Sequence, residues 1–338
     1  MGCLLPLTMR ASADAGEIQP DRLNFGIVHV AAKVQGSVRI FVDPEELKSG
    51  KAKVTAPAFV KVDSVNQGTQ EYGPGNRKGY CDIAVTIDTA NPGKVSSPIV
   101  MSLGKRRVEV PVSADIRPRK PVLPRILVAD TPFQKFSTGD AKLFDPWLKL
   151  VEAGGFDVDY VDVRSAKSAL DGVELSQYDT VLLGEMGLIR LNAEDIAALR
   201  RYAQNGGRVI LAANAFFMGT VENANKILIP SGLEIRNVEM PNVGAIEVGA
   251  ANITPCPQTD GVKALSFHRP SPGVVIDHDR TLVLVSSPKN PDEHFVALAS
   301  TGKGQVVSLG VSLWWSWVGK ADNAALLENL LRRKPRKG

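Results

Sequence analysis

The spacing of apolar residues changes near residue 120, and this change constrains the fold more than any other feature. Between residues 18 and 116, short runs alternate between apolar and polar positions, with Gly, Pro or Asn interrupting them every 8–12 residues. These runs are residues 23–30, 36–42, 81–87, 99–103 and 107–114. Such alternation is typical of strands with one buried face, so we predict a β-sandwich over residues 18–116. Only residues 44–48 indicate a helical turn.

Beyond residue 124, continuous apolar runs alternate with segments of helical spacing. The predicted strands are residues 125–130, 157–163, 180–184 and 208–212, and the predicted helices are residues 142–153 and 192–204. Asn192 is the expected N-cap of the second helix, with Asp195 completing a capping box. Buried strands that alternate with amphipathic helices form a mostly parallel sheet covered on both faces. The predicted fold class is therefore a sandwich followed by an α/β domain.

The last third of the chain has a more mixed pattern. We expect a short helix over residues 222–229, an irregular stretch with short strands over 233–280, and strands over 282–286, 295–300 and 305–309. Lys303 and Gly304 are the expected turn between the last two strands. Residues 323–332 are predicted to form a closing amphipathic helix.

Residues 117–124 contain three prolines in eight positions and separate the two patterns. Proline-rich segments are extended and semi-rigid, so we interpret this stretch as a linker whose basic residues are solvated. A length of 338 residues suits two domains, and a composition that is 44% hydrophobic and 22% charged excludes a disordered chain.

The net charge of +4 originates at the C-terminus. Residues 332–338 carry five positive charges, so the rest of the chain has a charge of −1. A basic tail over residues 334–338 could bind nucleic acid or an anionic lipid surface. No aromatic residue interleaves with these charges, which favours a solvated end.

Residues 1–17 resemble a processing segment. A mostly apolar stretch precedes Ala11-Ser12-Ala13, which has the small-x-small form of a signal-peptidase site. We interpret it as the end of an export signal whose start lies upstream, implying a periplasmic or extracellular protein. A frayed terminus of a cytoplasmic protein is the alternative. No apolar run reaches the ~18–20 residues that cross a membrane.

Two stretches of the N-terminal part resemble immunoglobulin-like modules of the abnormal-spindle/hydin type. IQPDRLNFGIV (residues 18–28) is similar to the Pro-x-x-Leu-x-Phe-Gly-x-Val pattern of their first strand. VEVPVSADI (residues 108–116) resembles their final strand. The resemblance implies an Ig-like sandwich that serves as an interaction module.

Residues 125–333 resemble the class I glutamine amidotransferase-like superfamily, in particular a bacterial branch without catalysis. The resemblance rests on residues 191–213 with NGGRVIL, on NKILIPSGLEI (225–235), and on GKGQVV (302–307) with DNAALL (322–327). The three stretches occur in the order of the family. They imply a flavodoxin-like domain with three α/β/α layers.

The residues of an amidotransferase triad are missing. The resemblance places a cysteine nucleophile on a tight turn after a strand, but the matching stretch here is AANAF (212–216), with Asn214 at the nucleophile position. A side-chain amide does not attack a carbonyl. GVSLW (310–314), after the late strand, contains no histidine. Glutamine amidotransferase activity is therefore not expected.

The carboxyl ends of the strands could still bind a ligand. Asp130, Glu185 and Asn214 follow three predicted strands, and ligands of open α/β sheets bind at this edge. Paired carboxylates could perform acid–base chemistry or bind sugar hydroxyls, or each could cap a neighbouring helix. Trp314 is a fourth candidate, whereas strand-like alternation would place Trp315 and Trp317 together in a structural role.

The remaining residue types predict no cofactor and no metal site. His29, His268, His278 and His294 show no metal-ligand spacing, and we expect His278 in a surface turn. The three cysteines exclude a disulfide-dense scaffold or zinc ribbon, while a disulfide between Cys81 and Cys256 stays open.

Two classes of function agree with these observations. The first is a non-catalytic binding or scaffold protein of the cell envelope, with a protein or carbohydrate partner. The second is a glycan-processing enzyme that uses Asp130 and Glu185. Nucleic-acid binding through the tail is a further alternative.

Overall fold

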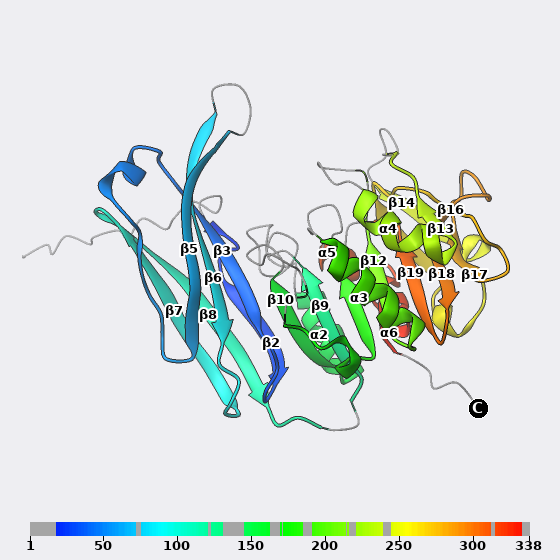
Figure 1. Cartoon of the computed structure of the whole chain (residues 1–338), viewed down its shortest axis with the longest axis horizontal. Helices are drawn as coiled ribbons and strands as arrows, with labels where there is room; N and C mark the ends of the chain where they lie inside the picture. Colours follow the sequence, from blue (N-terminus) through cyan, green and yellow to red (C-terminus); the bar gives the residue numbers. More distant parts are fainter. Residues whose placement is uncertain are drawn as a thin grey trace, which may run out of the picture.

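The computed structural model describes residues 18–71, 76–120, 123–130, 145–162, 170, 172–184, 191–213, 215, 221–238, 245–311 and 315–332. Of the described residues, Asp130, Asp162, Trp315 and Ser316 are placed by their backbone alone. The chain is mostly β-structure with few helices, arranged as a two-sheet N-terminal unit beside a larger mixed sheet (Figure 1).

The N-terminal unit consists of two four-stranded sheets that face each other across a shared core (Figure 1). One sheet has the order β1-β3-β6-β5 and the other the order β2-β8-β7-β4. The elements are β1 (Ile18–Gln19), β2 (Leu23–His29), β3 (Gln35–Val42), η1 (Glu46–Ser49), β4 (Lys53–Thr55), β5 (Val60–Glu71), β6 (Arg77–Ile87), β7 (Gly93–Leu103) and β8 (Arg106–Arg117).

Alternation of apolar residues explains these strands. In β8, Val108, Val110, Val112, Ala114 and Ile116 are buried, and the residues between them are exposed or half-buried. One face of the strand therefore joins the core. All five predicted strand runs and the helical turn are confirmed. No strand was predicted at β5, where Val60 is buried and the other positions are half-buried or exposed.

The larger sheet has nine strands, with eight in the order β10-β9-β11-β12-β19-β18-β16-β13 and β17 paired to β18. The first five are mutually parallel, and β18, β16, β13 and β17 pair antiparallel. The strands are β9 (Arg125–Asp130), β10 (Asp157–Asp162), β11 (Thr180–Leu183), β12 (Arg208–Ala212), β13 (Leu233–Ile235), β16 (Gly273–Val275), β17 (Thr281–Ser286), β18 (His294–Thr301) and β19 (Gly304–Leu309). A separate hairpin joins β14 (Ala245–Gly249) to β15 (Ala264–His268).

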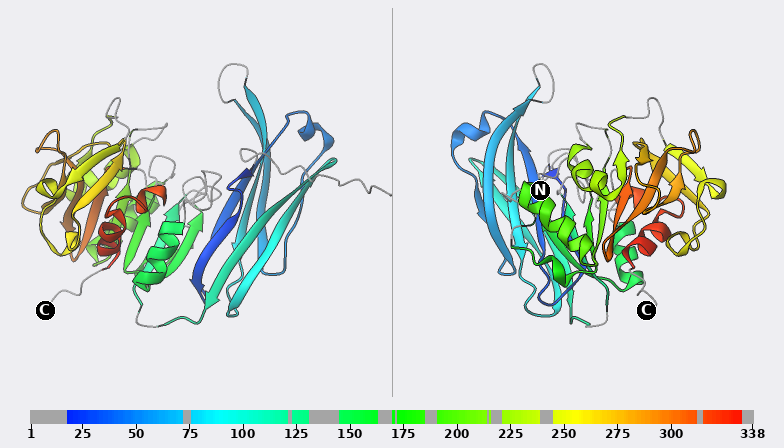
Figure 2. Two further views of the ribbon diagram at one scale, coloured as in Figure 1. Left: turned by 180° about the vertical axis from the view of Figure 1, so that it is seen from behind. Right: turned by 45° about the vertical axis from the view of Figure 1, so that its right-hand side comes forward.

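Helices cover both faces of this sheet. Buried residues of α2 and α6 belong to one apolar cluster and those of α3 and α4 to another, so the pairs lie on opposite sides (Figure 2). The helices are α2 (Asp145–Gly154), α3 (Ala193–Gln204), α4 (Glu222–Ser231), α5 (Trp315–Val318) and α6 (Asn323–Leu331), with 3-10 turns η3 (Leu175–Gln177), η4 (Ala250–Asn252) and η5 (Pro257–Thr259).

The start of α3 has the predicted capping box. The Asn192 side-chain oxygen accepts a hydrogen bond from the Asp195 backbone N–H at 2.8 Å. The Asp195 carboxylate accepts one from the Asn192 backbone N–H at 3.1 Å. These reciprocal bonds satisfy two N–H groups that have no partner within the helix, so the local sequence determines where α3 begins.

Two local predictions need correction. The turn between β18 and β19 is formed by Gly302 and Lys303, because Thr301 pairs with Gly304 and Gly302 has a φ of 58°. Trp315 and Trp317 lie in the helix α5, so strand-like alternation does not apply to them. The apolar run resembled a strand, but a helical turn here brings Trp317 into the core beside Phe267.

Candidate functional site

In the sequence, Asp130 ends β9, and Glu185, Asn214 and Trp314 come after β11, β12 and β19, whose carboxyl ends lie at one edge of the parallel sheet. The register pairs Ala129 with Leu183, Leu183 with Leu211, and Ala212 with Leu309, so β9, β11, β12 and β19 end at the same level. The strand order reverses between β9 and β11, and the helices that follow these two strands cover opposite faces. Crevices form at such reversals because the connecting chains diverge there.

In the sequence, Asp130 therefore ends one of the two strands that flank this reversal, and Glu185 comes after the other. The backbone of Asp130 closes β9, opposite Asp162 of β10. Its side chain, together with Glu185, Asn214 and Trp314, lies outside the described residues. The grouping of these four side chains into one site stays a prediction.

Ser271 contacts the described residue Ala215, which comes directly after Asn214 in the sequence. Ala215 donates a backbone hydrogen bond to the buried Ser271 hydroxyl at 2.8 Å, and Ser271 donates its own N–H to the Gly310 carbonyl at 2.8 Å. A Cβ atom at Gly310 would lie 2.2 Å from the Ser271 carbonyl oxygen, so the close approach requires glycine. Ser271 connects the segment after β12 to the end of β19, a role that its irregular sequence context did not reveal.

His294 lies at the same edge and was not singled out from the sequence. It begins β18, and the carbonyl of the next residue, Phe295, accepts a hydrogen bond from Gly310 at 2.8 Å. The side chain is buried, and neither ring nitrogen has a hydrogen-bond partner within the described chain. Burial lowers the pKa of His294 to about 4, so the imidazole is neutral at physiological pH.

Trp317 has the structural role that we expected. It is buried, and its ring centroid lies 5.9 Å from that of Phe267. Its backbone carbonyl accepts a hydrogen bond from the Asn323 side chain at 2.9 Å, which ties α5 to the start of α6. The side chain of Trp315 lies outside the described residues.

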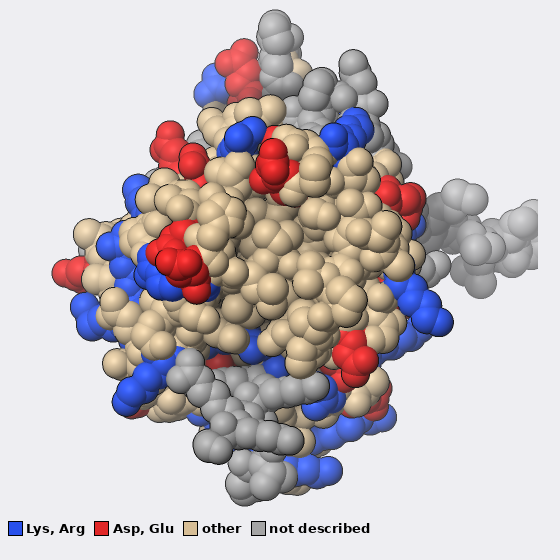
Figure 3. Space-filling model, turned by 90° about the vertical axis from the view of Figure 1, so that its right-hand side faces the viewer, with Lys and Arg blue, Asp and Glu red and all other residues tan. Residues whose placement is uncertain are grey.

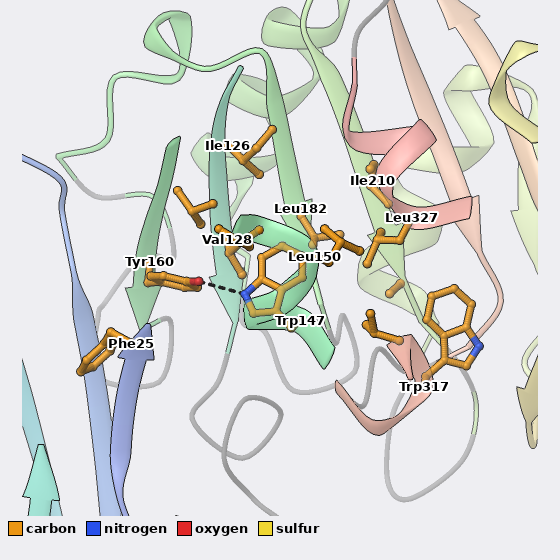
Figure 4. Packing of buried hydrophobic residues seen from close by; sticks show 14 of the residues in the cluster. Phe25, Ile126, Val128, Trp147, Leu150, Tyr160, Leu182, Ile210, Trp317 and Leu327 are labelled. Carbon is orange, nitrogen blue, oxygen red and sulfur yellow. Dashed lines mark hydrogen bonds between the residues drawn. The ribbon is translucent and has the colours of Figure 1, made fainter. Parts of the chain in front are cut away.

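The edge strand β10 is covered by the N-terminal unit. Tyr160 donates its backbone N–H to the Lys33 carbonyl at 2.8 Å, and Val34 forms a parallel β-bridge with Tyr160. The Tyr160 ring lies 6.3 Å from the ring of Phe25, and its hydroxyl accepts a hydrogen bond from Trp147 Nε1 at 2.9 Å (Figure 4). One apolar cluster therefore extends from the two-sheet unit into the α/β sheet.

A buried charge network lies beside these aromatic contacts. Asp157 Oδ1 is 3.1 Å from His29 Nδ1, and Asp157 Oδ2 is 2.9 Å from Arg119 Nε. Asp159 lies 3.5 Å from Arg119 Nη2 and 3.0 Å from Arg125 Nη2. The two aspartate side chains are only 3% and 1% exposed. Carboxylates this deeply buried need such partners, so they require the cations that surround them.

This network corrects the expectation that the basic residues of segment 117–124 are solvated. Arg119 is 28% exposed and pairs with both buried aspartates. The prolines around it gave no sign of this role, because both partners lie on β10, almost 40 positions further along the chain. The pairing links the segment between the units to the edge of the sheet.

The basic tail also begins as part of the folded structure. Arg332 donates a hydrogen bond to the Gly154 carbonyl at 2.6 Å, pairs with Glu328 at 2.9 Å, and lies 5.0 Å above the ring of Phe156. The first of the five tail charges is thus compensated. Residues 333–338 lie outside the described chain, so their expected solvation stays a prediction.

Metal and thiol chemistry find little support among the described residues. No group of three or more His, Cys, Asp or Glu residues in this part of the chain could hold a metal ion. Cys81 and Cys256 are both free, and burial raises the pKa of Cys81 to about 11, which keeps its thiol protonated. His278 lies in an exposed turn, as predicted. No described helix is long and apolar enough to cross a membrane.

Exposed apolar side chains gather at the end of the molecule far from the N-terminal unit. Ile229, Val238, Ile276 and Leu282 are 39–53% exposed and lie in or next to α4, β13, β16 and β17. This end shows a wide central area without Lys, Arg, Asp or Glu, and charged residues lie around it (Figure 3). Surfaces of this kind are common at protein contacts.

Comparisons with known proteins give low similarities. No family model and no curated protein matches the chain. A ThuA-like protein from Bacteroides uniformis is 14% identical over 65% of this chain and 96% of its own, with a TM-score of 0.44. A ThuA-like protein from Parabacteroides merdae is 13% identical over 64% and 94%, with a TM-score of 0.37.

A β-galactosidase from Rahnella sp. R3 is 11% identical over 62% of this chain, with a TM-score of 0.40. The match spans only 32% of the length of that enzyme. All of these identities and TM-scores are low, so they do not assign the chain to a family.

Proposed function

We propose that the chain is a non-catalytic binding or scaffold protein, exported to the cell envelope. Residues 18–116 would be an Ig-like interaction module, and residues 125–333 a flavodoxin-like domain related to class I glutamine amidotransferases. The observation that carries the proposal is Asn214, which follows β12 by two residues. The resemblance places the nucleophilic thiol at this position, and an amide cannot replace it.

The junction between the two units supports a scaffold. Buried aromatic contacts and the paired aspartates of β10 join the units along a sheet edge. Such a junction holds the two-sheet unit and the strand-end crevice at a constant distance. A protein partner could then contact both, or use the apolar surface around Ile229 and Leu282.

A glycan-processing enzyme is the second candidate. It is favoured by the places of Asp130 and Glu185 in the chain, at the end of β9 and two residues after β11, the strands on either side of the order reversal. Two carboxylates at such a crevice are the residue types that glycoside hydrolysis requires.

One set of measurements on the full chain separates the two candidates. Purified protein is incubated with a glycan panel and with glutamine, and the release of reducing ends and of ammonia is followed. The same panel is screened by thermal shift, with Asp130→Asn and Glu185→Gln as variants and exposed Glu109→Gln as the matched control. We expect no turnover. A glycan that raises the melting temperature only with intact Glu185 would indicate a carbohydrate partner.

If no glycan shifts the melting temperature, protein partners are sought next by pull-down with the full chain. Release of reducing ends that falls a hundredfold or more in Asp130→Asn, but not in Glu109→Gln, would overturn the proposal and establish the enzyme.

A further inference from the structure

A cavity of about 300 Å³ lies at the junction between the two units, away from the strand-end crevice. Its lining comes from β2, from the segment that joins the units, and from the end of α2. The apolar part of the wall includes Ile27, Leu123, Val151 and Phe156. This volume is at the lower end of the range for small-molecule sites.

His29 gives the cavity a buried polar group. The residue is only 5% exposed, and its Nδ1 faces Asp157 Oδ1 at 3.1 Å. His29 also lines the cavity. With Nδ1 turned to a carboxylate, Nε2 is the ring nitrogen left to form a hydrogen bond with a ligand.

Lys120 supplies charge at the rim. It is exposed, lines the cavity, and forms no ion pair with the described residues. Arg117, also at the rim, shares its charge with Asp115 at 2.9 Å and Glu152 at 3.5 Å. Glu152 also lines the cavity, so Lys120 is the rim cation of the described chain that is left without a carboxylate partner and can pair with an anionic ligand.

The backbone conformation at the junction preserves the close contact beside this cavity. Gly26 has a φ of 60°, and a Cβ atom there would lie 2.5 Å from Leu148 Cδ2 of α2. The positive φ is the conformation that favours glycine, and the Leu148 side chain of α2 packs directly against this position of β2 beside the cavity.

We propose that this cavity binds a small monocarboxylate with an apolar body. The carboxylate would pair with Lys120 Nζ on the side of the cavity that holds His29, and the apolar body would pack against Val151 and Phe156. Because the lining comes from both units, a bound ligand would stabilise the junction and raise the melting temperature of the whole chain.

The test compares each acid with its own amide. Saturated straight-chain carboxylates from butanoate to decanoate, and phenylacetate, are titrated into the full chain by calorimetry, alongside the matching primary amides. At least one acid should bind roughly tenfold or more tightly than its amide, since the amide lacks the charge. Lys120→Gln should remove most of that difference, and Lys120→Glu should abolish binding of the acid.

His29→Gln should also weaken binding of the acid, but a buried substitution can destabilise the fold. Lys120 is exposed, so its variants keep the folded structure and carry the test. Lys105→Gln, in the exposed turn between β7 and β8, is the matched control and should bind like the unchanged chain. Equal affinity for acid and amide, no binding of any acid, or unchanged binding in both Lys120 variants would overturn the proposal.

Discussion

Replacing His294 with glutamine should remove one acid-sensitive part of the stability of the protein. In the folded chain, burial holds the pKa of His294 near 4, whereas an exposed histidine titrates near 6.5. As the pH falls below 6.5, the unfolded state binds a proton that the folded state cannot bind, so the free energy of unfolding decreases. Above pH 6.5 neither state is protonated, and the residue contributes no pH dependence.

The expected size follows from the two pKa values. Between about pH 7.5 and about pH 4.5, the difference of roughly 2.5 units corresponds to about 2–3 kcal/mol of lost stability. The His294→Gln variant lacks this titration. Whatever its stability at neutral pH, its loss over the same pH interval should be smaller by about 2–3 kcal/mol.

Urea unfolding followed by tryptophan fluorescence at a series of pH values measures this difference. His278→Gln, in an exposed turn, is the matched control, and its pH dependence should equal that of the unchanged chain. Subtracting the variant's stability curve from that of the original chain cancels the pH dependence that comes from carboxylates, because these titrate in both proteins. Curves for His294→Gln and the original chain that run parallel across the interval would refute the reasoning.

Two further substitutions test the local and the long-range parts of the fold by the same unfolding assay. Asn192→Ala removes the N-cap of α3 and should lower the free energy of unfolding by about 1 kcal/mol. The exposed Glu194→Ala is its control and should change the free energy of unfolding by no more than about 0.5 kcal/mol. Equal losses in the two variants would contradict the capping role of Asn192. Arg119→Met leaves the buried Asp157 without its arginine partner and should cost about 3 kcal/mol, against less than about 1 kcal/mol for the exposed Arg107→Met. A loss for Arg119→Met no larger than that for Arg107→Met would show that the network does not stabilise the junction.

Most regular elements could be predicted from the sequence, because their signals are local. The apolar positions of β8 alternate along one strand, and Asn192 and Asp195 are three residues apart. The wrong strand-like prediction for Trp315 and Trp317 has a physical cause. The apolar stretch containing Trp317 fits a strand or a helix equally well over so few residues, and only packing against Phe267 decides between them.

The candidate site was predicted only as positions in the chain. Strand ends can be located from apolar runs, so Asp130 and Glu185 could be placed next to neighbouring strands. His294 could not be found in this way, because its strand reaches the same edge by an antiparallel return from the other end of the domain. Its burial and its lowered pKa depend on contacts that the spacing of residues does not encode.

The sequence by itself determined the two periodicities, the capping box of α3 and the absence of a thiol at position 214, since each depends on residues close together in the chain. Only the tertiary structure decided that Arg119 pairs with buried aspartates and that Tyr160 is covered by the N-terminal unit. A free linker and a docked one have the same local pattern of prolines and charges. What separates them is the burial of complementary surfaces from distant segments, and the stabilisation from that burial exists only once the whole chain has folded.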